Sequence, residues 1–236
     1  EAARLGYAIR DTHIADDAHM RTSVKDLLDK NFAKKLSSLI DMKKRAKLPS
    51  APTPGNDTVY LTVVDRDRTA VSFINSLYSS FGLGICTEKT GIMLTNRGAC
   101  FTLEQGHPNV FGPDKRPMHT IIPALAMRNG RCDMSFGVMG AHYQPMGHVQ
   151  IILNMLDYGM DVQQAIDAPR FFFEGEQTDV EHGTPIATID GLKARGHDVA
   201  MASLPWGGAQ TIKIDWDRGV LIAGSEPRKD GCALGY

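Results

Sequence analysis

The junction Asn56-Asp57-Thr58 is the place in this sequence where residue type and position could do chemistry. A threonine hydroxyl is a weak nucleophile at neutral pH and needs an adjacent base. The α-amino group of the same residue suits this role because its pKa is about 7.7–8.0, but it is free only when threonine begins a chain. Cleavage between Asp57 and Thr58, with the Thr58 hydroxyl attacking the carbonyl of Asp57, would supply that amine. By spacing alone, the junction also fits a linker that simply runs into a strand.

The other reactive side chains form no recognisable site in the sequence. Cys86, Cys100, Cys132 and Cys232 are far apart and make no CxxC pair, so we expect free thiols rather than a disulfide framework or a zinc site. The histidines are scattered as well, and no GxGxxG, P-loop, HExxH or GxSxG sequence is present. The residues therefore predict no metal and no nucleotide cofactor.

The segment before the junction changes character along its length. Apolar residues recur at helical spacing within residues 1–48, and Ser23 is typical of a helix start. Residues 48–56 hold three prolines within six positions, which neither a helix nor a central strand accepts. This linker is the clearest boundary in the sequence, and it divides the chain into residues 1–57 and 58–236.

After the linker, the pattern of apolar residues changes to a period of two. β-Branched and aromatic side chains at 58–65, a turn, and a second such run at 70–74 predict a hairpin. Further strands are expected at 91–95, 121–127, 133–138, 209–215 and 219–224, and helices at 146–158, 161–167 and 187–195, the last stopped by Gly196. The order of helices, strands, helices and strands favours a layered α+β fold over alternating βαβ units.

Composition sets outer limits on function. The chain has 236 residues and a formal net charge of −1, with 42% hydrophobic and 22% charged residues. A nearly neutral chain has no global field to hold nucleic acid or an anionic membrane, and no run of about 18 apolar residues predicts a spanning helix. The sequence begins at Glu1 in what reads as the middle of a helix, so we expect it to be the C-terminal part of a longer chain or a processed product.

An ordered series of short matches covers essentially all of residues 58–236. The matching segments are Asp57–Asp65, Ala70–Ser72, Phe81–Ile85, Gly91–Leu94, Lys115–Pro117, Pro123, Gly137–Gly140, Asp157–Gly159, Ala165, Ala168–Phe171 and Gly231–Tyr236. In this order they resemble the small subunit of the gamma-glutamyltransferase family, whose members are N-terminal-nucleophile hydrolases. The resemblance implies a four-layered αββα sandwich and an acyl-transfer reaction without metal or organic cofactor. It also implies that residues 1–57 are the last helices and tail of the large subunit, and residues 58–236 the catalytic small subunit.

Catalytic roles carry over by position from the family resemblance. Thr58 matches the family's nucleophile, which autocatalytic cleavage after Asp57 would release, and Ser76 matches the hydroxyl residue that hydrogen-bonds the nucleophile. Gly140 and Ala141 match the paired glycines whose N–H groups form the oxyanion hole. Because Ala141 departs from glycine, its methyl group could crowd the acyl group or require an unfavourable φ.

Four further positions bear on the substrate by the same resemblance. His119 and Thr120 match a pair of serines that contact substrate. Tyr78 and Cys100 stand where glutamyl-specific members carry an asparagine and an acidic residue for the amino-acid head, and a thiol cannot replace a carboxylate as partner of an ammonium group. The expected substrates are γ-glutamyl or related dicarboxylic acyl amides, of glutathione or glutaryl type. The departures favour an acyl group without an α-amine, as in the cephalosporin acylases of this family.

Two interpretations of the whole chain are open at this point. The first is an enzyme that acts on a small-molecule amide together with the large subunit of its own precursor, and that could assemble as a homodimer of heterodimers. The second is an uncleaved, degenerate relative that acts as a non-catalytic binding scaffold. Whether the protein is cytoplasmic or exported depends on sequence upstream of Glu1.

Overall fold

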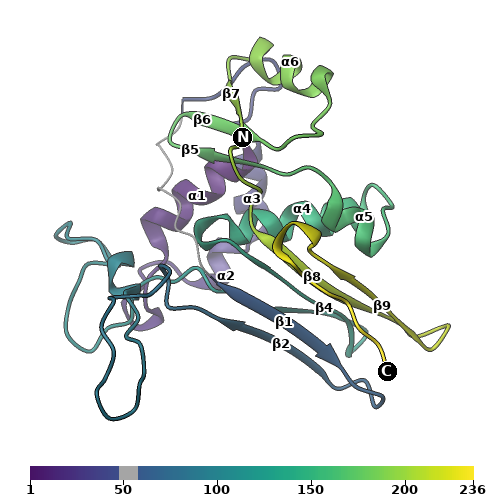
Figure 1. Ribbon diagram of the computed structural model, residues 1–236. Helices are drawn as coiled ribbons and strands as arrows, with labels where there is room; N and C mark the ends of the chain where they lie inside the picture. Colours follow the sequence, from purple (N-terminus) through teal and green to yellow (C-terminus); the bar gives the residue numbers. More distant parts are fainter. Residues whose placement is uncertain (48–57) are drawn as a thin grey trace.

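The computed structural model describes residues 1–47 and 58–236 (Figure 1). The first part contains the helices α1 (Ala2–His13), α2 (Val24–Leu27) and α3 (Lys30–Ser37). The strands of the second part are β1 (Val59–Val64), β2 (Ala70–Asn75), β3 (Ala124–Arg128), β4 (Arg131–Met139), β5 (Phe171–Glu174), β6 (Gln177–Val180), β7 (Asp198–Met201), β8 (Gly208–Asp215) and β9 (Val220–Ser225). Its α-helices are α4 (Gln144–Leu156), α5 (Val162–Asp167) and α6 (Ile186–Ala194). Short 3-10 helices lie at Asp17–His19, Arg97–Cys100, Ala141–Tyr143 and Pro227–Lys229.

Three layers make up the main body of the molecule. The antiparallel hairpin β1–β2 packs on the sheet β3–β4–β8–β9, and α4 and α5 cover the other face of that sheet (Figure 1). A smaller sheet, β5–β6–β7, lies beside this body together with α6. The predicted α+β architecture is confirmed, and the layers are arranged as two stacked sheets with helices outside.

The interface between the two stacked sheets is lined by small and hydroxylated residues. The ring of Tyr60 lies directly on Gly137, where an added Cβ would come within 2.4 Å of the ring. The next pair along the strands is Thr62 and Ser135, whose hydroxyl oxygens are 2.5 Å apart. Because side chains on one face recur every two residues, these two contacts fix how β1 lies along β4.

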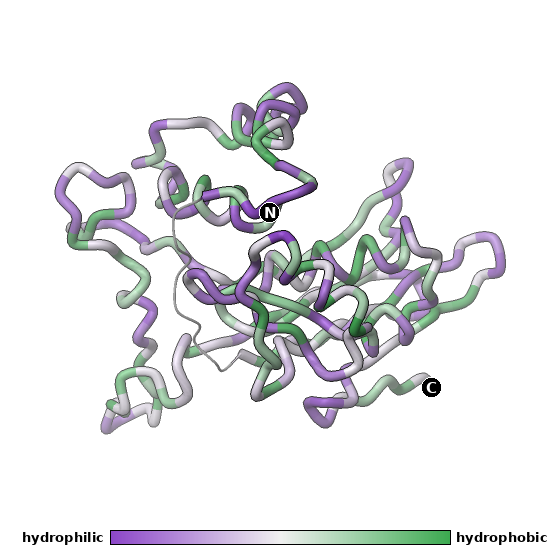
Figure 2. The backbone as a smooth tube through the Cα atoms, turned by 90° about the horizontal axis from the view of Figure 1, so that it is seen from above, coloured by the Kyte–Doolittle hydropathy of each residue, from purple (hydrophilic) through white to green (hydrophobic). Residues whose placement is uncertain are grey.

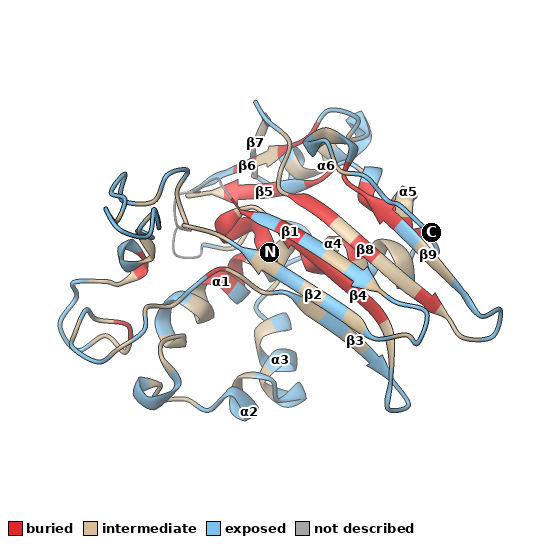
Figure 3. Ribbon diagram, turned by 60° about the horizontal axis from the view of Figure 1, so that its bottom comes forward, coloured by how far each residue is buried: buried red, intermediate tan, exposed pale blue. Residues whose placement is uncertain are grey.

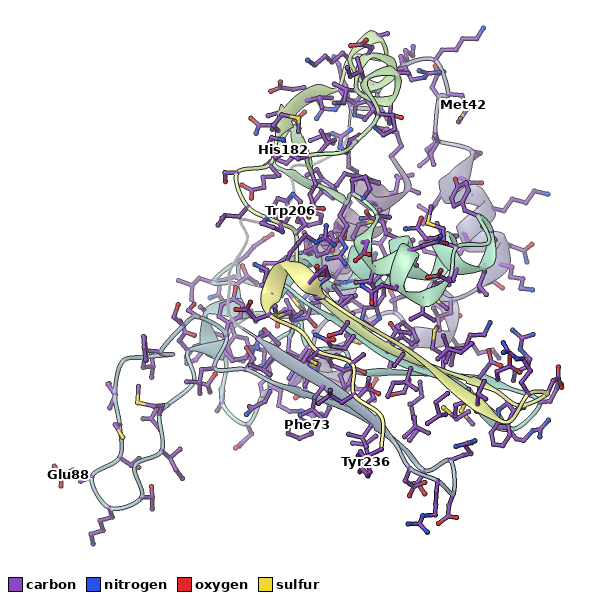
Figure 4. All side chains as sticks on the ribbon, turned by 45° about the vertical axis from the view of Figure 1, so that its right-hand side comes forward. Met42, Phe73, Glu88, His182, Trp206 and Tyr236 are labelled. Atoms are coloured by element: carbon purple, nitrogen blue, oxygen red, sulfur yellow. The ribbon has the colours of Figure 1, made fainter. Side chains whose placement is uncertain are left out.

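The outer face of the β1–β2 hairpin is apolar and exposed. Val59, Leu61, Val63 and Phe73 are between 44% and 67% exposed, and Phe73 points away from the four-stranded sheet (Figure 4). In an αββα sandwich this is the face that the fourth layer, a second helical layer, covers. The exposed apolar face is therefore where the fold expected from the sequence places its remaining layer.

The hydrophobic core joins the first and second parts of the chain. Tyr7 of α1 makes edge-on ring contacts with Phe172 and Phe173 of β5, at centroid distances of 5.5 and 5.3 Å. Buried residues concentrate along β4, β8 and β5 (Figure 3), whereas many loop tips are hydrophilic (Figure 2). The phenylalanine run at 171–173 thus belongs largely to the core.

Several local predictions are confirmed and others are wrong. Ser23 is the N-cap of α2 and accepts a hydrogen bond from the Asp26 N–H, and Gly196, with φ of 87°, follows the end of α6. Residues 91–95 form no strand, only an isolated bridge between Met93 and Cys86. Strands β5, β6 and β7 were not predicted. Among the described residues, no helix has the length and apolar character needed to cross a membrane.

Candidate active site

The β1–β2 hairpin brings Thr58 and Ser76 together. Val59 pairs with Asn75, so the residues just before β1 and just after β2 face each other across the strands. The Thr58 hydroxyl donates to Ser76 Oγ over 3.1 Å, and the Tyr78 N–H donates to the same oxygen over 2.9 Å. Thr58 is only 8% exposed. The hairpin register therefore places the candidate nucleophile in a shielded position beside a second hydroxyl.

The packing of β1 on β4 places Thr58 near the end of β4. Thr62 contacts Ser135 and Tyr60 covers Gly137, so each step of two residues back along β1 moves two residues forward along β4. The next step pairs Thr58 with the Met139–Gly140 region. The predicted cleavage residue Asp57 lies outside the described residues.

The turn after β4 has an unusual backbone at Gly140 and Ala141. Gly140 has φ of 132°, which strongly favours glycine, and Ala141 has φ of 47°, a left-handed conformation that costs an L-residue about 1–2 kcal/mol. The hydrogen bonds of the described residues leave both N–H groups without an acceptor. The methyl group of Ala141 is buried. Ala141 thus adopts the left-handed φ that the sequence analysis questioned, and the two N–H groups stay available to bind an oxyanion.

The loop before β8 fixes this turn from one side. A Cβ on Gly140 would lie 2.9 Å from the Gly207 Cα, and a Cβ on Gly207 would lie 2.5 Å from the Met139 carbonyl oxygen. Trp206, labelled in Figure 4, packs on the rings of Tyr143 and Phe172. The two chain segments are in contact here because neither glycine has a side chain.

A buried network of ion pairs holds that loop. Arg170 Nη1 donates to the Trp206 carbonyl over 2.9 Å, and Glu181 Oε1 accepts from the Trp206 N–H over 2.6 Å. Arg170 also pairs with Glu226 at 2.6 Å, and Arg228 joins Glu181 to Glu226. Arg170 and Glu226 are 2% and 0% exposed. The network binds both the N–H and the carbonyl of Trp206 and so fixes the loop against the Gly140 turn.

A second polar cluster surrounds Tyr78, two residues after Ser76. The Arg97 guanidinium lies over the Tyr78 ring at 4.5 Å and donates to the Thr120 hydroxyl over 2.9 Å. The Tyr78 hydroxyl is 3.3 Å from Nε2 of His142, and its ionisation also responds to the neighbouring Cys100 thiol. This cluster reaches the Gly140 turn because His142 directly follows Ala141.

Backbone strain and shifted pKa values set the second cluster apart from its surroundings. Tyr78 has φ of 82°, a strained value for a bulky residue that occurs mainly at functional sites. Burial is the main reason that the pKa of Tyr78 rises to about 12. Burial, followed by the charges of Arg10 and Arg97, lowers the pKa of His142 to about 4. His142 is therefore neutral at physiological pH beside two permanent cations.

The structure brings most of the predicted site residues into these two neighbouring groups. Thr58, Ser76, Gly140 and Ala141 lie around one end of the stacked sheets, and Tyr78, Cys100 and Thr120 lie in the adjoining cluster. His119 is exposed, and no described contact joins it to the cluster. Among the described residues, no three His, Cys, Asp or Glu side chains gather as a metal site.

Sequence reasoning missed three members of the second cluster. Arg97 lies three residues before Cys100, which the resemblance had singled out, but the side chain of Arg97 was not considered. Arg10 and His142 contact each other over 3.1 Å although 132 positions separate them. Spacing along the chain gives no signal for such a contact, whereas Arg97 could have been found from its closeness to Cys100 in the sequence.

Comparisons with known proteins point to one family. The family model described as gamma-glutamyltranspeptidase matches residues 1–236. The glutathione hydrolase-like YwrD proenzyme of Bacillus subtilis is 39% identical over 100% of this chain and 46% of its own length. The oxamate amidohydrolase proenzyme of Klebsiella pneumoniae is 35% identical over 100% and 46%. The crystal structure of cephalosporin acylase from Bacillus halodurans superposes with a TM-score of 0.89 and 36% identity over 99% of this chain and 44% of that one. The chain thus spans just under half the length of the curated relatives it matches.

Proposed function

The chain belongs to the gamma-glutamyltranspeptidase family, and we propose that it carries the catalytic residues of an enzyme that hydrolyses or transfers the acyl group of an amide. The observation that carries this proposal is the hydrogen bond between the Thr58 and Ser76 hydroxyls, at the end of the sandwich where the N–H groups of Gly140 and Ala141 find no acceptor among the described residues. The N-terminal-nucleophile hydrolase fold, shared with the cephalosporin acylase structure, provides the frame for this chemistry.

Cleavage of the precursor would create the nucleophile. The Thr58 hydroxyl attacks the Asp57 carbonyl carbon, the Asp57–Thr58 C–N bond breaks, and an ester links the two residues. Water hydrolyses the ester, which leaves the carboxylate of Asp57 and the free α-amine of Thr58. We propose residues 1–57 as the end of the large subunit and residues 58–236 as the small subunit. Relatives named as proenzymes support this division.

Turnover would use the same hydroxyl with the new amine as base. The amine takes the proton of the Thr58 hydroxyl, because its pKa is near neutrality. The oxygen attacks the amide carbonyl, and the N–H groups of Gly140 and Ala141 stabilise the negative charge on the tetrahedral intermediate. The protonated amine of Thr58 then gives its proton to the leaving amine. Water or another amine finally takes the acyl group from Thr58.

The residues around the site favour acyl groups that lack an α-amine. Cys100 and Tyr78 stand where an ammonium-binding carboxylate and an amide would be expected in a glutamyl-specific enzyme, and no carboxylate of a described residue lies within 4.0 Å of the nearby Arg97. A cationic site repels an ammonium group. We therefore propose dicarboxylic acyl amides of the glutaryl type as preferred substrates over γ-glutamyl amides.

Turnover of two chromogenic anilides tests the proposal. We expect the complete protein to cleave glutaryl p-nitroanilide with a higher kcat/KM than γ-glutamyl p-nitroanilide. Thr58→Ala should abolish both activities, and Ser76→Ala should lower kcat while Thr58 remains in place. A strong preference for the γ-glutamyl compound would refute the substrate assignment, and full activity of Thr58→Ala would refute the mechanism.

A further inference from the structure

No carboxylate of the described residues compensates the charge of the Arg97 guanidinium. Three described arginines, namely Arg4, Arg10 and Arg97, bury an Nη2 atom that lacks a hydrogen-bond acceptor among the described residues. Arg4 and Arg10 each have a carboxylate within 4.0 Å, on Glu176 and Asp11. For Arg97 the described residues offer no such carboxylate; its Nη1 atom bonds only the neutral hydroxyl of Thr120. A shielded cation without a counter-ion is unfavourable, so this one is poised to gain an anion.

We propose that Arg97 is the receptor for a carboxylate on the acyl group of the substrate. The proposal rests on the proposed acyl-transfer function and names the group that would select the acyl chain. Arg97 is held beside the candidate nucleophile through Tyr78, since its guanidinium stacks on the Tyr78 ring and the Tyr78 N–H bonds the Ser76 hydroxyl that accepts from Thr58.

The Arg97 guanidinium is oriented before any ligand binds. Stacking on Tyr78 and the bond to Thr120 fix the plane of the guanidinium and leave the Nη2 edge without an acceptor. A planar guanidinium binds a carboxylate through two parallel N–H···O bonds. The residue as a whole is half-buried, while its Nη2 atom is buried, so a carboxylate bound there would be shielded from water.

The surroundings of Arg97 strengthen its attraction for an anion. Arg10 adds a second guanidinium, 3.1 Å from Nδ1 of His142, and the charges of both arginines reach His142. The described groups in contact with Arg97, the Tyr78 ring and the Thr120 hydroxyl, are uncharged at pH 7, as is the His142 ring. Among the described residues, the carboxylate of Asp11 pairs with Arg10 at 2.6 Å, and no carboxylate pairs with Arg97. The net field of the cluster is therefore positive.

A purely structural role for Arg97 makes a different prediction. If the guanidinium only supported the Tyr78 ring, its removal would lower the turnover of charged and neutral acyl substrates by the same factor. If Arg97 is a carboxylate receptor, its removal instead lowers the ratio of turnover of the charged substrate to turnover of the neutral one. A charge-assisted hydrogen bond is worth about 1.5–3 kcal/mol, or about 10- to 100-fold in selectivity.

Paired anilides that differ only in charge provide the test. In the complete protein, we expect kcat/KM for glutaryl p-nitroanilide to exceed that for its carboxamide isostere, glutaramoyl p-nitroanilide. Arg97→Gln should reduce this preference by about 10- to 100-fold, and Arg97→Lys should retain part of it. Arg131→Gln is the matched control, because Arg131 also stacks on an aromatic ring, Trp216, but lies at the opposite end of β4. An unchanged ratio in Arg97→Gln, or no preference in the unmodified protein, would overturn the assignment.

A binding measurement separates this proposal from the proposed function. Calorimetric titration with glutarate and with its neutral diamide, glutaramide, requires no turnover. If neither anilide is cleaved but glutarate binds better than glutaramide and Arg97→Gln removes the difference, the acyl-transfer function fails and the carboxylate site stands. If anilides are cleaved without regard to charge and glutarate shows no advantage, the function stands and the carboxylate site fails. Where Arg97→Gln does not fold, the comparison of the two ligands on the unmodified protein decides.

Discussion

Two groups of buried polar side chains adjoin the turn at Gly140 and Ala141, and they differ in how their arginines are paired. Arg170 bonds the carboxylate of Glu226 and the carbonyls of Trp206 and Ile166, whereas Arg97 bonds one neutral hydroxyl. A buried carboxylate partner, Glu226, makes Arg170 part of the scaffold that positions the turn. Arg97 has no carboxylate partner among the described residues, which leaves its charge able to bind an anion. An arginine in this site is thus structural or suited to bind a ligand according to whether the protein itself supplies its anion.

Removing Arg170 should lower the free energy of unfolding strongly, in contrast to removing Arg97. Arg170→Ala leaves Glu226 buried with a reduced set of partners, and breaking a buried pair lowers the free energy of unfolding by about 3–5 kcal/mol. Urea unfolding of the complete protein measures this change. Arg128→Ala is the control, because its pair with Asp133 is largely exposed and is worth at most about 1 kcal/mol. Equal effects of the two variants would show that the Arg170 network is not a scaffold.

Substitution of Gly207 should separate activity from folding. The Cβ of Gly207→Ala would meet the Met139 carbonyl oxygen and the Tyr143 ring, so the Gly140 turn must move. Loss of one oxyanion donor lowers kcat by about 100- to 1000-fold. Gly219→Ala is the matched control, because Gly219 has nearly the same φ, 69° against 65°, but open space around it. If Gly207→Ala has the same kcat as the control, the loop at Gly207 does not position the Gly140 turn for catalysis.

Removing Arg97 should leave stability almost unchanged. Arg97→Gln eliminates a shielded cation without a counter-ion, so we expect a free energy of unfolding within about 1 kcal/mol of the unmodified protein. Glutarate should raise the melting temperature of the unmodified protein and not that of the variant. A loss as large as that of Arg170→Ala would place Arg97 in the scaffold instead.

Acidification should destabilise the folded protein through the buried side chains of His142 and His148. The pKa values of His142 and His148 are both about 4, below the ordinary 6.5, through burial alone for His148 and with the help of Arg10 and Arg97 for His142. The unfolded chain then binds the protons first. The contribution of these histidines to the free energy of unfolding is therefore complete above pH 6.5. Below that, the free energy of unfolding falls by about 1.4 kcal/mol per pH unit for each histidine until the pH reaches about 4.

Titration of the two histidines also tests the electric field around Arg97, with His148 as a reference outside the Arg97 cluster. In Arg97→Gln, the pKa of His142 should rise because one repelling charge is gone, while the pKa of His148 stays the same. Titration of the histidine ring signals by NMR measures both. Parallel movement of the two pKa values would contradict the proposed field around Arg97.

Much of the frame could be predicted because its signals are local. The alternation of β1 and β2 and the Ser23 cap each depend on neighbouring residues, whereas the linker expected at residues 48–56 lies outside the described residues. The short strands β5 and β6, of four residues each, carry too little pattern to predict, and residues 91–95 have a strand-like composition but no partner strand. The Arg97 cluster combines α1, the loop after β2 and the turn after β4. Only the folded chain brings these segments together.

The proposed mechanism requires Thr58 to become the first residue of its own polypeptide. Intact-mass measurement of the purified complete protein tests this cleavage directly, with Thr58→Ala as the control. We expect a fragment whose mass equals that of the chain from Thr58 onward, and no such fragment from the variant. A single uncleaved mass in an active preparation would refute the mechanism, and in an inactive one it would favour a non-catalytic scaffold.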